Sequence, residues 1–230
     1  MSSQRATTAF PVSPGALFVS GFRGFARRPW PLLAAGALTF ATYAVFRVPA
    51  QLAGDDGRWL LSVVLDLCGL IMGGTLAHPW YVQALATVDE RPVPLGAAFA
   101  RPRRFLDQLV ASFWFWSGFL LGLRYLLGIP SLVVLAFYAF YGYVIADGAA
   151  DGGLKALGES VRLGHKRRVA IVAIGLLFAI FEIVAALPLG YGISPVTIGV
   201  TVVLLLVSTS ITMVAGATLY RALQEARTDA

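Results

Sequence analysis

Residues 166–188 read KRRVAIVAIGLLFAIFEIVAALP: three basic residues, then a long apolar run in which Glu182 is the only charge. A helix needs roughly 20 apolar residues to cross a hydrocarbon core about 30 Å thick, and this run has that length. Similar apolar runs recur along the chain. The predicted spans are residues 30–50, 59–81, 105–127, 129–147, 168–188 and 195–220.

The composition favours a membrane protein and excludes an ordinary soluble domain. Hydrophobic residues make up 58% of the chain and charged residues 13%, and the mean hydropathy is +0.76. The apolar runs do not alternate with a period of two, which excludes a closed β-barrel. Backbone amides in hydrocarbon must be paired within their own segment, so the runs are predicted to be helices. We therefore expect an all-α integral membrane protein with six transmembrane helices.

The basic residues are distributed unequally between the two sides of this pattern. Of the 18 Lys and Arg residues, only Arg47, Arg58 and Arg124 fall on one side, and the rest fall on the other. Basic residues beside membrane spans stay in the cytoplasm, so both termini are predicted to be cytoplasmic. The net charge of +6 favours anionic lipid headgroups as partners and not nucleic acid. The predicted lipid contacts are Arg27, Arg28, Arg103, Arg104, Lys166, Arg167 and Arg168.

The spans are predicted to form three hairpins, each preceded by a short amphipathic helix on the cytoplasmic side. In the first such segment, residues 16–28, Leu17, Phe18, Phe22 and Phe25 share one helical face, which suits a helix in the headgroup region. The three units are interpreted either as an internal repeat or as unrelated hairpins that each need basic residues where they enter the membrane from the cytoplasm. The hairpins are residues 30–81, 105–147 and 168–220, and the two later amphipathic segments are residues 98–105 and 153–168. The predicted domains are a tail with an interfacial helix (1–29), a transmembrane domain (30–221) and a second tail (222–230).

Four charged residues are predicted to lie within the membrane as one cluster: Arg47, Asp66, Arg124 and Glu182. The helical rise places Asp66 and Glu182 at nearly the same depth, close to the level of the two arginines. A carboxylate in hydrocarbon costs at least a few kcal/mol unless it is paired or hydrated. We expect Asp66 to pair with Arg47, and Glu182 to face Arg124 or a hydrated cavity. The alternative is that the arginines reach outward and the acids are protonated or bonded to hydroxyls.

Aromatic side chains gather in the cytoplasmic half of the third and fourth spans. Trp114, Trp116, Tyr138 and Tyr141 are typical of a lipid-facing belt. The functional alternative is a groove for a lipid tail, a quinone or a pigment.

His78 is placed close to the inner interface by its position in the second span. We interpret it as a structural residue, with the ligand of a haem or chlorophyll as the alternative. No other cofactor and no metal site is expected. The glycine pairs Gly69/Gly73 and Gly118/Gly122 allow helices to approach closely, either inside the chain or between two copies. Asp151 is expected to cap the helix that follows it.

The run Ala146-Asp147-Gly148, followed by Gly153-Leu154-Lys155-Ala156-Leu157 and Ser160, carries a resemblance. It resembles a family of uncharacterised bacterial six-helix membrane proteins that is related to the membrane domain of some glycerophosphodiester phosphodiesterases. Its motif is confined to residues 146–168. The resemblance implies a fold and a location in the bacterial cytoplasmic membrane, and it carries no activity.

The sequence contains none of the common catalytic signatures, such as a nucleophile elbow, a zinc-protease motif or a phosphate-binding loop. We therefore expect a non-enzymatic membrane subunit that scaffolds a larger assembly with other membrane subunits, or that organises lipid. The alternatives are a small transporter or lipid-handling protein that uses the intramembrane charges, and a pigment- or haem-binding subunit.

Overall fold

The computed structural model describes residues 12–192 and 194–228, together with every side chain in these ranges except those of Arg124 and Tyr125. Residues 1–11, part of the predicted amino-terminal tail, lie outside this description. The described residues form helices and no strand. The α-helices are α1 (Pro14–Arg27), α2 (Pro29–Asp55), α3 (Trp59–Leu76), α4 (His78–Val88), α5 (Pro102–Tyr125), α6 (Ile129–Tyr138), α7 (Tyr141–Asp147), α8 (Gly153–Leu163), α9 (Arg168–Ala186) and α10 (Pro195–Thr228). Two 3-10 helices, η1 (Leu95–Phe99) and η2 (Leu187–Tyr191), complete the set.

Six segments are long and apolar enough to cross a membrane, which confirms the predicted class and the predicted number of spans. They are α2, α3 with α4, α5, α6 with α7, α9 with η2, and α10. The last has 34 residues, about 51 Å at 1.5 Å per residue, and so exceeds a 30 Å hydrocarbon core. The residues from 222 to 228, predicted to be a tail, continue this helix.

Two of the spans are each divided into two helices. The second breaks at Ala77, just before Pro79, which lacks an amide hydrogen for the helical ladder. The fourth breaks around Phe140, whose backbone N–H donates to Ser160 Oγ at 3.1 Å. A side chain of α8 thus satisfies an amide that the interrupted helix leaves free.

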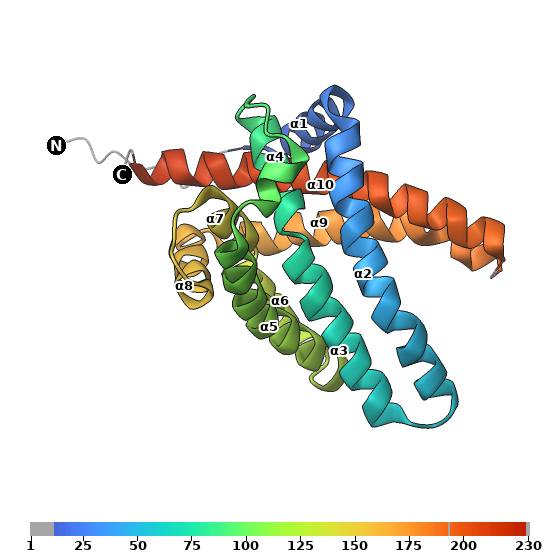
Figure 1. Ribbon diagram of the computed structural model, residues 1–230. Coiled ribbons are helices and arrows are strands. Elements are labelled where there is room, and N and C mark those ends of the chain that lie inside the picture. The colour runs from blue at the N-terminus through green and yellow to red at the C-terminus, as the bar shows by residue number, and fades with distance from the viewer. Residues whose placement is uncertain (1–11, 193, 229–230) are drawn as a thin grey trace.

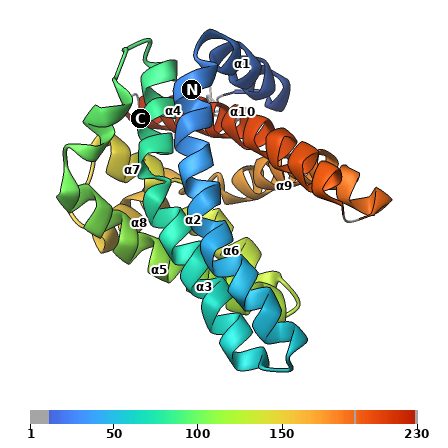
Figure 2. The same cartoon turned by 45° about the vertical axis from the view of Figure 1, so that its right-hand side comes forward.

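The six segments pack pairwise, α2 on α3, α5 on α6 and α9 on α10 (Figure 1). The first two pairs run side by side through contacts between α3 and α5, whereas the α9–α10 pair points away from them (Figures 1 and 2). We call the region where α1, α4, α7, α8 and the carboxyl-terminal half of α10 meet the converging end. We call the α2–α3 and α9–α10 connections, with the turns beside them, the diverging ends.

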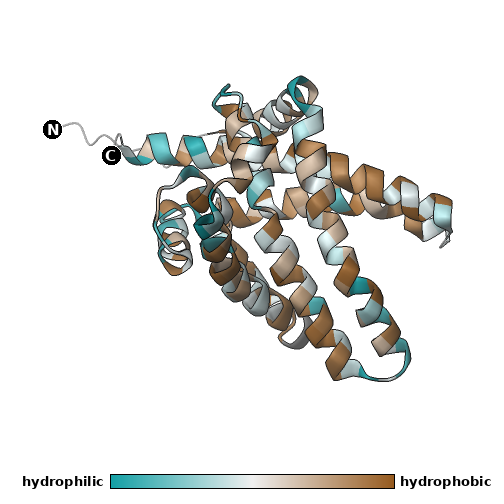
Figure 3. Cartoon of the chain, in the orientation of Figure 1, coloured by the Kyte–Doolittle hydropathy of each residue, from teal (hydrophilic) through white to brown (hydrophobic). Residues whose placement is uncertain are grey.

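The hydrophobic core lies at the converging end. Its members come from almost every helix there and include Leu17, Trp80, Val144, Leu157 and Tyr220, each of which is at least 95% buried. The diverging ends instead expose large apolar side chains: in Figure 3 many of the helical turns there are brown, whereas the α2–α3 connection itself is teal. Examples are Leu52, Trp59, Leu60, Leu187, Tyr191 and Val196.

The amino-terminal amphipathic segment is a helix, as predicted, and it lies across α10. Its contact surface is built around Leu17, Gly21 and Gly24, all buried. A Cβ on Gly21 would lie 2.6 Å from the backbone oxygen of Ile211, so only glycine permits this approach. Phe22, predicted to lie on the apolar face of this helix, is 50% exposed and meets the ring of Phe181 on α9 edge-on.

The other two amphipathic segments differ from each other. Residues 153–163 form the amphipathic helix α8, as predicted. The middle segment, residues 98–105, is not a separate amphipathic α-helix: it contains the end of the 3-10 helix η1 and the first turn of α5. Pro94 precedes η1, and Pro102 starts α5 just after it.

The glycine pairs serve packing inside the chain. Gly69 and Gly73 face Tyr43 and neighbouring residues of α2, and Gly122 faces Ser131 at the start of α6. The close approaches that they allow are therefore used within the α2–α3 and α5–α6 pairs.

Candidate functional site

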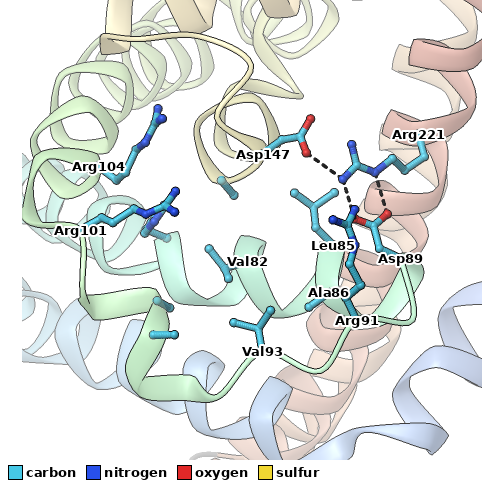
Figure 4. Close-up of a pocket in the computed structure, with 14 residues that line it drawn as sticks. Val82, Leu85, Ala86, Asp89, Arg91, Val93, Arg101, Arg104, Asp147 and Arg221 are labelled. Atoms are coloured by element: carbon cyan, nitrogen blue, oxygen red, sulfur yellow. Dashed lines mark hydrogen bonds and ion pairs between the residues drawn. The ribbon is translucent and has the colours of Figure 1, made fainter.

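The converging end contains a pocket of about 360 Å³, bordered by α4, η1, the start of α5, the end of α7 and α10. Apolar side chains such as Val82, Leu85 and Val93 line part of it. The remaining walls are strongly charged, with arginines on two opposite sides (Figure 4). We name this the rim pocket.

One wall of the rim pocket is an ion network centred on Arg221. Its guanidinium donates to both oxygens of Asp89, at 2.8 and 2.6 Å, and to Asp147 Oδ1 at 2.8 Å. Asp147 also accepts from Tyr220 and Gln224, and Arg91 donates to Asp89 at 2.9 Å. Two arginines face two aspartates, so this wall is close to electrically neutral. It ties α4, α7 and α10 together.

The opposite wall carries an excess of positive charge. Arg104 Nη1 donates to the backbone oxygen of Ala150 at 2.9 Å, and its Nη2 lies 3.5 Å from Asp151, a carboxylate that is 80% exposed. Arg101 forms no ion pair with any described residue. Both side chains lie across the pocket from Arg221 (Figure 4).

His78 lies in the same pocket and is 3% exposed. Its ring meets that of Phe105 edge-on at 5.2 Å, and its Nδ1 has no hydrogen-bond partner among the described residues. Buried polar atoms without a partner are uncommon in folded proteins. His78 is thus part of the pocket wall and leaves one hydrogen-bonding atom unused.

The residues behind the family resemblance build this region. Gly148 ends α7 with a φ of 76°, a conformation that glycine adopts without strain. A Cβ on Gly153 would lie 2.9 Å from the backbone nitrogen of Ala111, so glycine lets α8 approach α5 closely. Ser160 Oγ accepts the hydrogen bond from the backbone N–H of Phe140. Asp151 does not cap α8, because the N-cap is Gly152, and it lies beside Arg104 instead.

The predicted lipid-contact residues all lie near the converging end, but they have different partners. Arg27 pairs with Glu90, Arg28 donates to the backbone oxygen of Arg91, and Arg104 lines the rim pocket. Lys166, Arg167 and Arg168 line a second basic pocket of about 460 Å³, with Arg162 and Arg227. Arg103, next to the rim pocket, is exposed.

The predicted pair of Asp66 and Arg47 is present, with Arg47 Nη1 donating to both carboxylate oxygens at 2.9 Å. Glu182 lies apart from this pair and accepts from three hydroxyls of α10, those of Ser208, Thr209 and Thr212. The four charged residues therefore do not form one cluster among the described side chains. The reason is that α9 leans toward α10 and away from α3 (Figure 1). The part of the prediction that concerns Arg124 falls on a side chain outside the description.

The four aromatic residues proposed as a groove do not share a surface. Tyr141 is buried, where its hydroxyl lies 3.2 Å from Ser112 Oγ, whereas Trp114 is 57% exposed. Trp116 packs on Phe115 and Phe119, and Tyr138 lies beside Phe137. Residues two apart on a helix point in nearly opposite directions, so Trp114 and Trp116 belong to different faces.

Sequence reasoning missed the residues that organise the rim pocket, above all Arg221, Asp89 and Arg101. Arg221 is the last residue of the predicted membrane domain, and Asp89 closely follows the second span. An acid and an arginine at the same predicted membrane surface are a usable signal for such a pair.

The sequence matches no family model, and searches of curated proteins and of solved structures found no match.

Proposed function

We propose that this chain is a non-enzymatic, multi-pass membrane subunit whose converging end binds anionic lipid headgroups beside other membrane proteins. One observation carries the proposal. The basic residues of α1, of the α4–α5 connection, of α8–α9 and of α10 come together at one end of a molecule whose other surfaces are largely apolar. A basic surface at the foot of apolar spans attracts anionic headgroups.

The orientation is part of the proposal. The three helix pairs act as membrane hairpins, both termini lie in the cytoplasm, and the protein resides in a bacterial cytoplasmic membrane. The positive-inside rule supports this orientation, because the basic converging end then faces the cytoplasm. A relation to the membrane domains of glycerophosphodiester phosphodiesterases is kept as a proposal, supported by the motif at residues 146–168.

Purification in a mild detergent, followed by lipid analysis of the purified protein, tests the proposal. We expect anionic lipid to be enriched over zwitterionic lipid, and a partner protein to co-elute reproducibly. The variant Lys166→Gln/Arg167→Gln should retain less anionic lipid, whereas Arg58→Gln, which removes a charge far from the converging end, should match the wild type. A lone protein with neither enriched lipid nor a partner contradicts the proposal.

One observation favours a second candidate, a small transporter or lipid-handling protein. Glu182 accepts three hydroxyl hydrogen bonds from α10, an arrangement that holds a carboxylate within a spanning helix pair. Intramembrane carboxylates often serve proton or ion transfer. Proton flux into proteoliposomes that is present in the wild type and absent in Glu182→Gln supports this candidate. No flux in either protein rejects it.

A further inference from the structure

We infer that the rim pocket is a specific binding site for a phosphate-bearing anion, held between Arg101 and Arg104 at the start of α5. The inference deepens the proposed function, on which it rests: it assigns one headgroup position where the proposal requires only a basic surface. The ligand is either the headgroup of a phosphate monoester lipid or a free phosphate monoester.

The charge balance of the pocket assigns the anion to one wall. Arg221 and Arg91 are engaged with Asp89 and Asp147, so they offer little net attraction. The ionic partner of Arg104 is an exposed carboxylate at 3.5 Å, its other contact being the neutral backbone oxygen of Ala150, and Arg101 has no ion pair among the described residues. Arginine guanidinium groups bind phosphate oxygens through paired hydrogen bonds.

The first turn of α5 adds to the positive potential at this wall of the pocket. Arg101 is the N-cap of the helix and makes no side-chain capping bond. Pro102 has no N–H, and the Arg104 N–H donates to the backbone oxygen of Arg101 at 2.9 Å. The first turn therefore offers a ligand the N–H of Arg103. A helix amino terminus carries partial positive charge and binds phosphate oxygens. Arg101 and Arg104 stand on the same turn and line the same pocket.

His78 adds a polar side chain to the pocket wall, where it is 97% buried and meets the ring of Phe105. Its Nδ1 has no partner among residues 12–192 and 194–228, but this atom is itself shielded from solvent. The pocket and its arginines therefore define the site, without this nitrogen.

The shape of the pocket fits an anion that carries a small organic group. Its volume of about 360 Å³ is within the range of sites for small molecules, roughly 300–1,000 Å³, and exceeds what a bare phosphate needs. Val82, Leu85 and Val93 provide an apolar floor opposite the charges. Glycerol 3-phosphate, the polar part of phosphatidic acid, carries the phosphate monoester charge and is small enough for this volume.

Two probes test the site and separate the sources of the ligand. Glycerol 3-phosphate is titrated calorimetrically into the full chain in phosphatidylcholine nanodiscs. Separately, lipid retention is measured by native mass spectrometry after reconstitution in mixed phosphatidylcholine and phosphatidic acid. Saturable binding of glycerol 3-phosphate identifies a free anion as ligand, and retention of phosphatidic acid alone identifies a lipid. If neither glycerol 3-phosphate nor phosphatidic acid binds, the inference is overturned.

Three variants give the test its specificity. Arg101→Gln should weaken binding about tenfold, because one charge-assisted contact is lost. Val82→Phe fills the pocket without changing charge and should weaken binding at least as much. Lys155→Gln removes one positive charge from α8, outside the pocket, and should bind like the wild type; equal melting temperatures show that all three variants fold.

The proposed function and this inference fail in different ways. If the wild type is enriched in anionic lipid but Arg101→Gln and Lys155→Gln lower the amount of bound lipid equally, the rim pocket is not a specific site. The proposal of a basic lipid-binding surface is then unaffected. If no anionic lipid is enriched but glycerol 3-phosphate binds with the expected loss in Arg101→Gln, the proposed lipid role fails and the anion site stands.

Discussion

The converging end and the diverging ends differ in whether their apolar side chains are covered by other parts of the protein. At the converging end, side chains from most of the helices bury one another, and the charged residues form a network across α4, α7 and α10. At the diverging ends, residues such as Trp59 and Tyr191 remain exposed, and lipid is the expected partner. Contacts between helices distant in the sequence gather at the converging end, whereas the diverging ends hold mainly contacts within each helix pair. We therefore expect mutations there to have larger effects than comparable mutations elsewhere.

Removing the central arginine of the ion network at the rim pocket should cause the largest loss of stability. Arg221→Met leaves Asp89 and Asp147 facing each other without their shared cation, and we expect a loss of about 3 kcal/mol in the free energy of unfolding. Arg58→Met removes an exposed arginine whose partner Asp56 is exposed too, and should change stability by less than about 0.5 kcal/mol. Denaturation of both variants in the same detergent measures the difference. Equal losses would show that the network does not distinguish the two ends.

Disturbing the contact between α1 and α10 should cause the second largest loss of stability. Two glycines of α1 provide the comparison, because only one of them lies against α10. Gly21→Ala places a Cβ 2.6 Å from the oxygen of Ile211, so we expect a loss of about 2 kcal/mol. Gly15→Ala meets nothing within 4 Å and should stabilise the helix by up to about 1 kcal/mol. Proteolysis at Arg23 and Arg27 should be faster only in Gly21→Ala. Similar cleavage rates in both variants would mean that α1 does not rest on α10.

The smallest effect should come from the ion pair between α2 and α3. Asp66→Arg places two arginines together, and the double variant Asp66→Arg/Arg47→Asp restores opposite charges. We expect the double variant to recover about 1 kcal/mol relative to the sum of the single changes. Thermal unfolding of the three variants completes the cycle. Strict additivity would show that the two residues do not interact.

The sequence was sufficient to predict the class, the six spans and the Asp66–Arg47 pair. Continuous apolar runs and a known helical rise determine which residues cross the membrane and which face each other across a short connection. Periodicity predicted a helix at residues 16–28, where apolar side chains repeat with a helical period, and the structure has one at Pro14–Arg27.

The rim pocket was not predictable in this way, and hydroxyl partners for Glu182 were predicted only as the alternative. They depend on how helices distant in the sequence are placed, and hydropathy carries no such information. Arg221 reaches Asp89 across 132 positions, and Glu182 meets the hydroxyls of α10 because the α9–α10 pair turns away from the others. The grouping of Trp114 with Trp116 failed for a local reason, since proximity in sequence was taken as proximity on a face.

The central claim is that the basic converging end faces the cytoplasm and the diverging ends lie outside. Reporter fusions that are active on one side of the membrane only test this most directly. The account predicts an outside signal for fusions after residues 56, 128 and 191, and an inside signal for fusions after residues 95 and 160, which border the rim pocket and α8. An outside signal after residue 95 or 160 would contradict it.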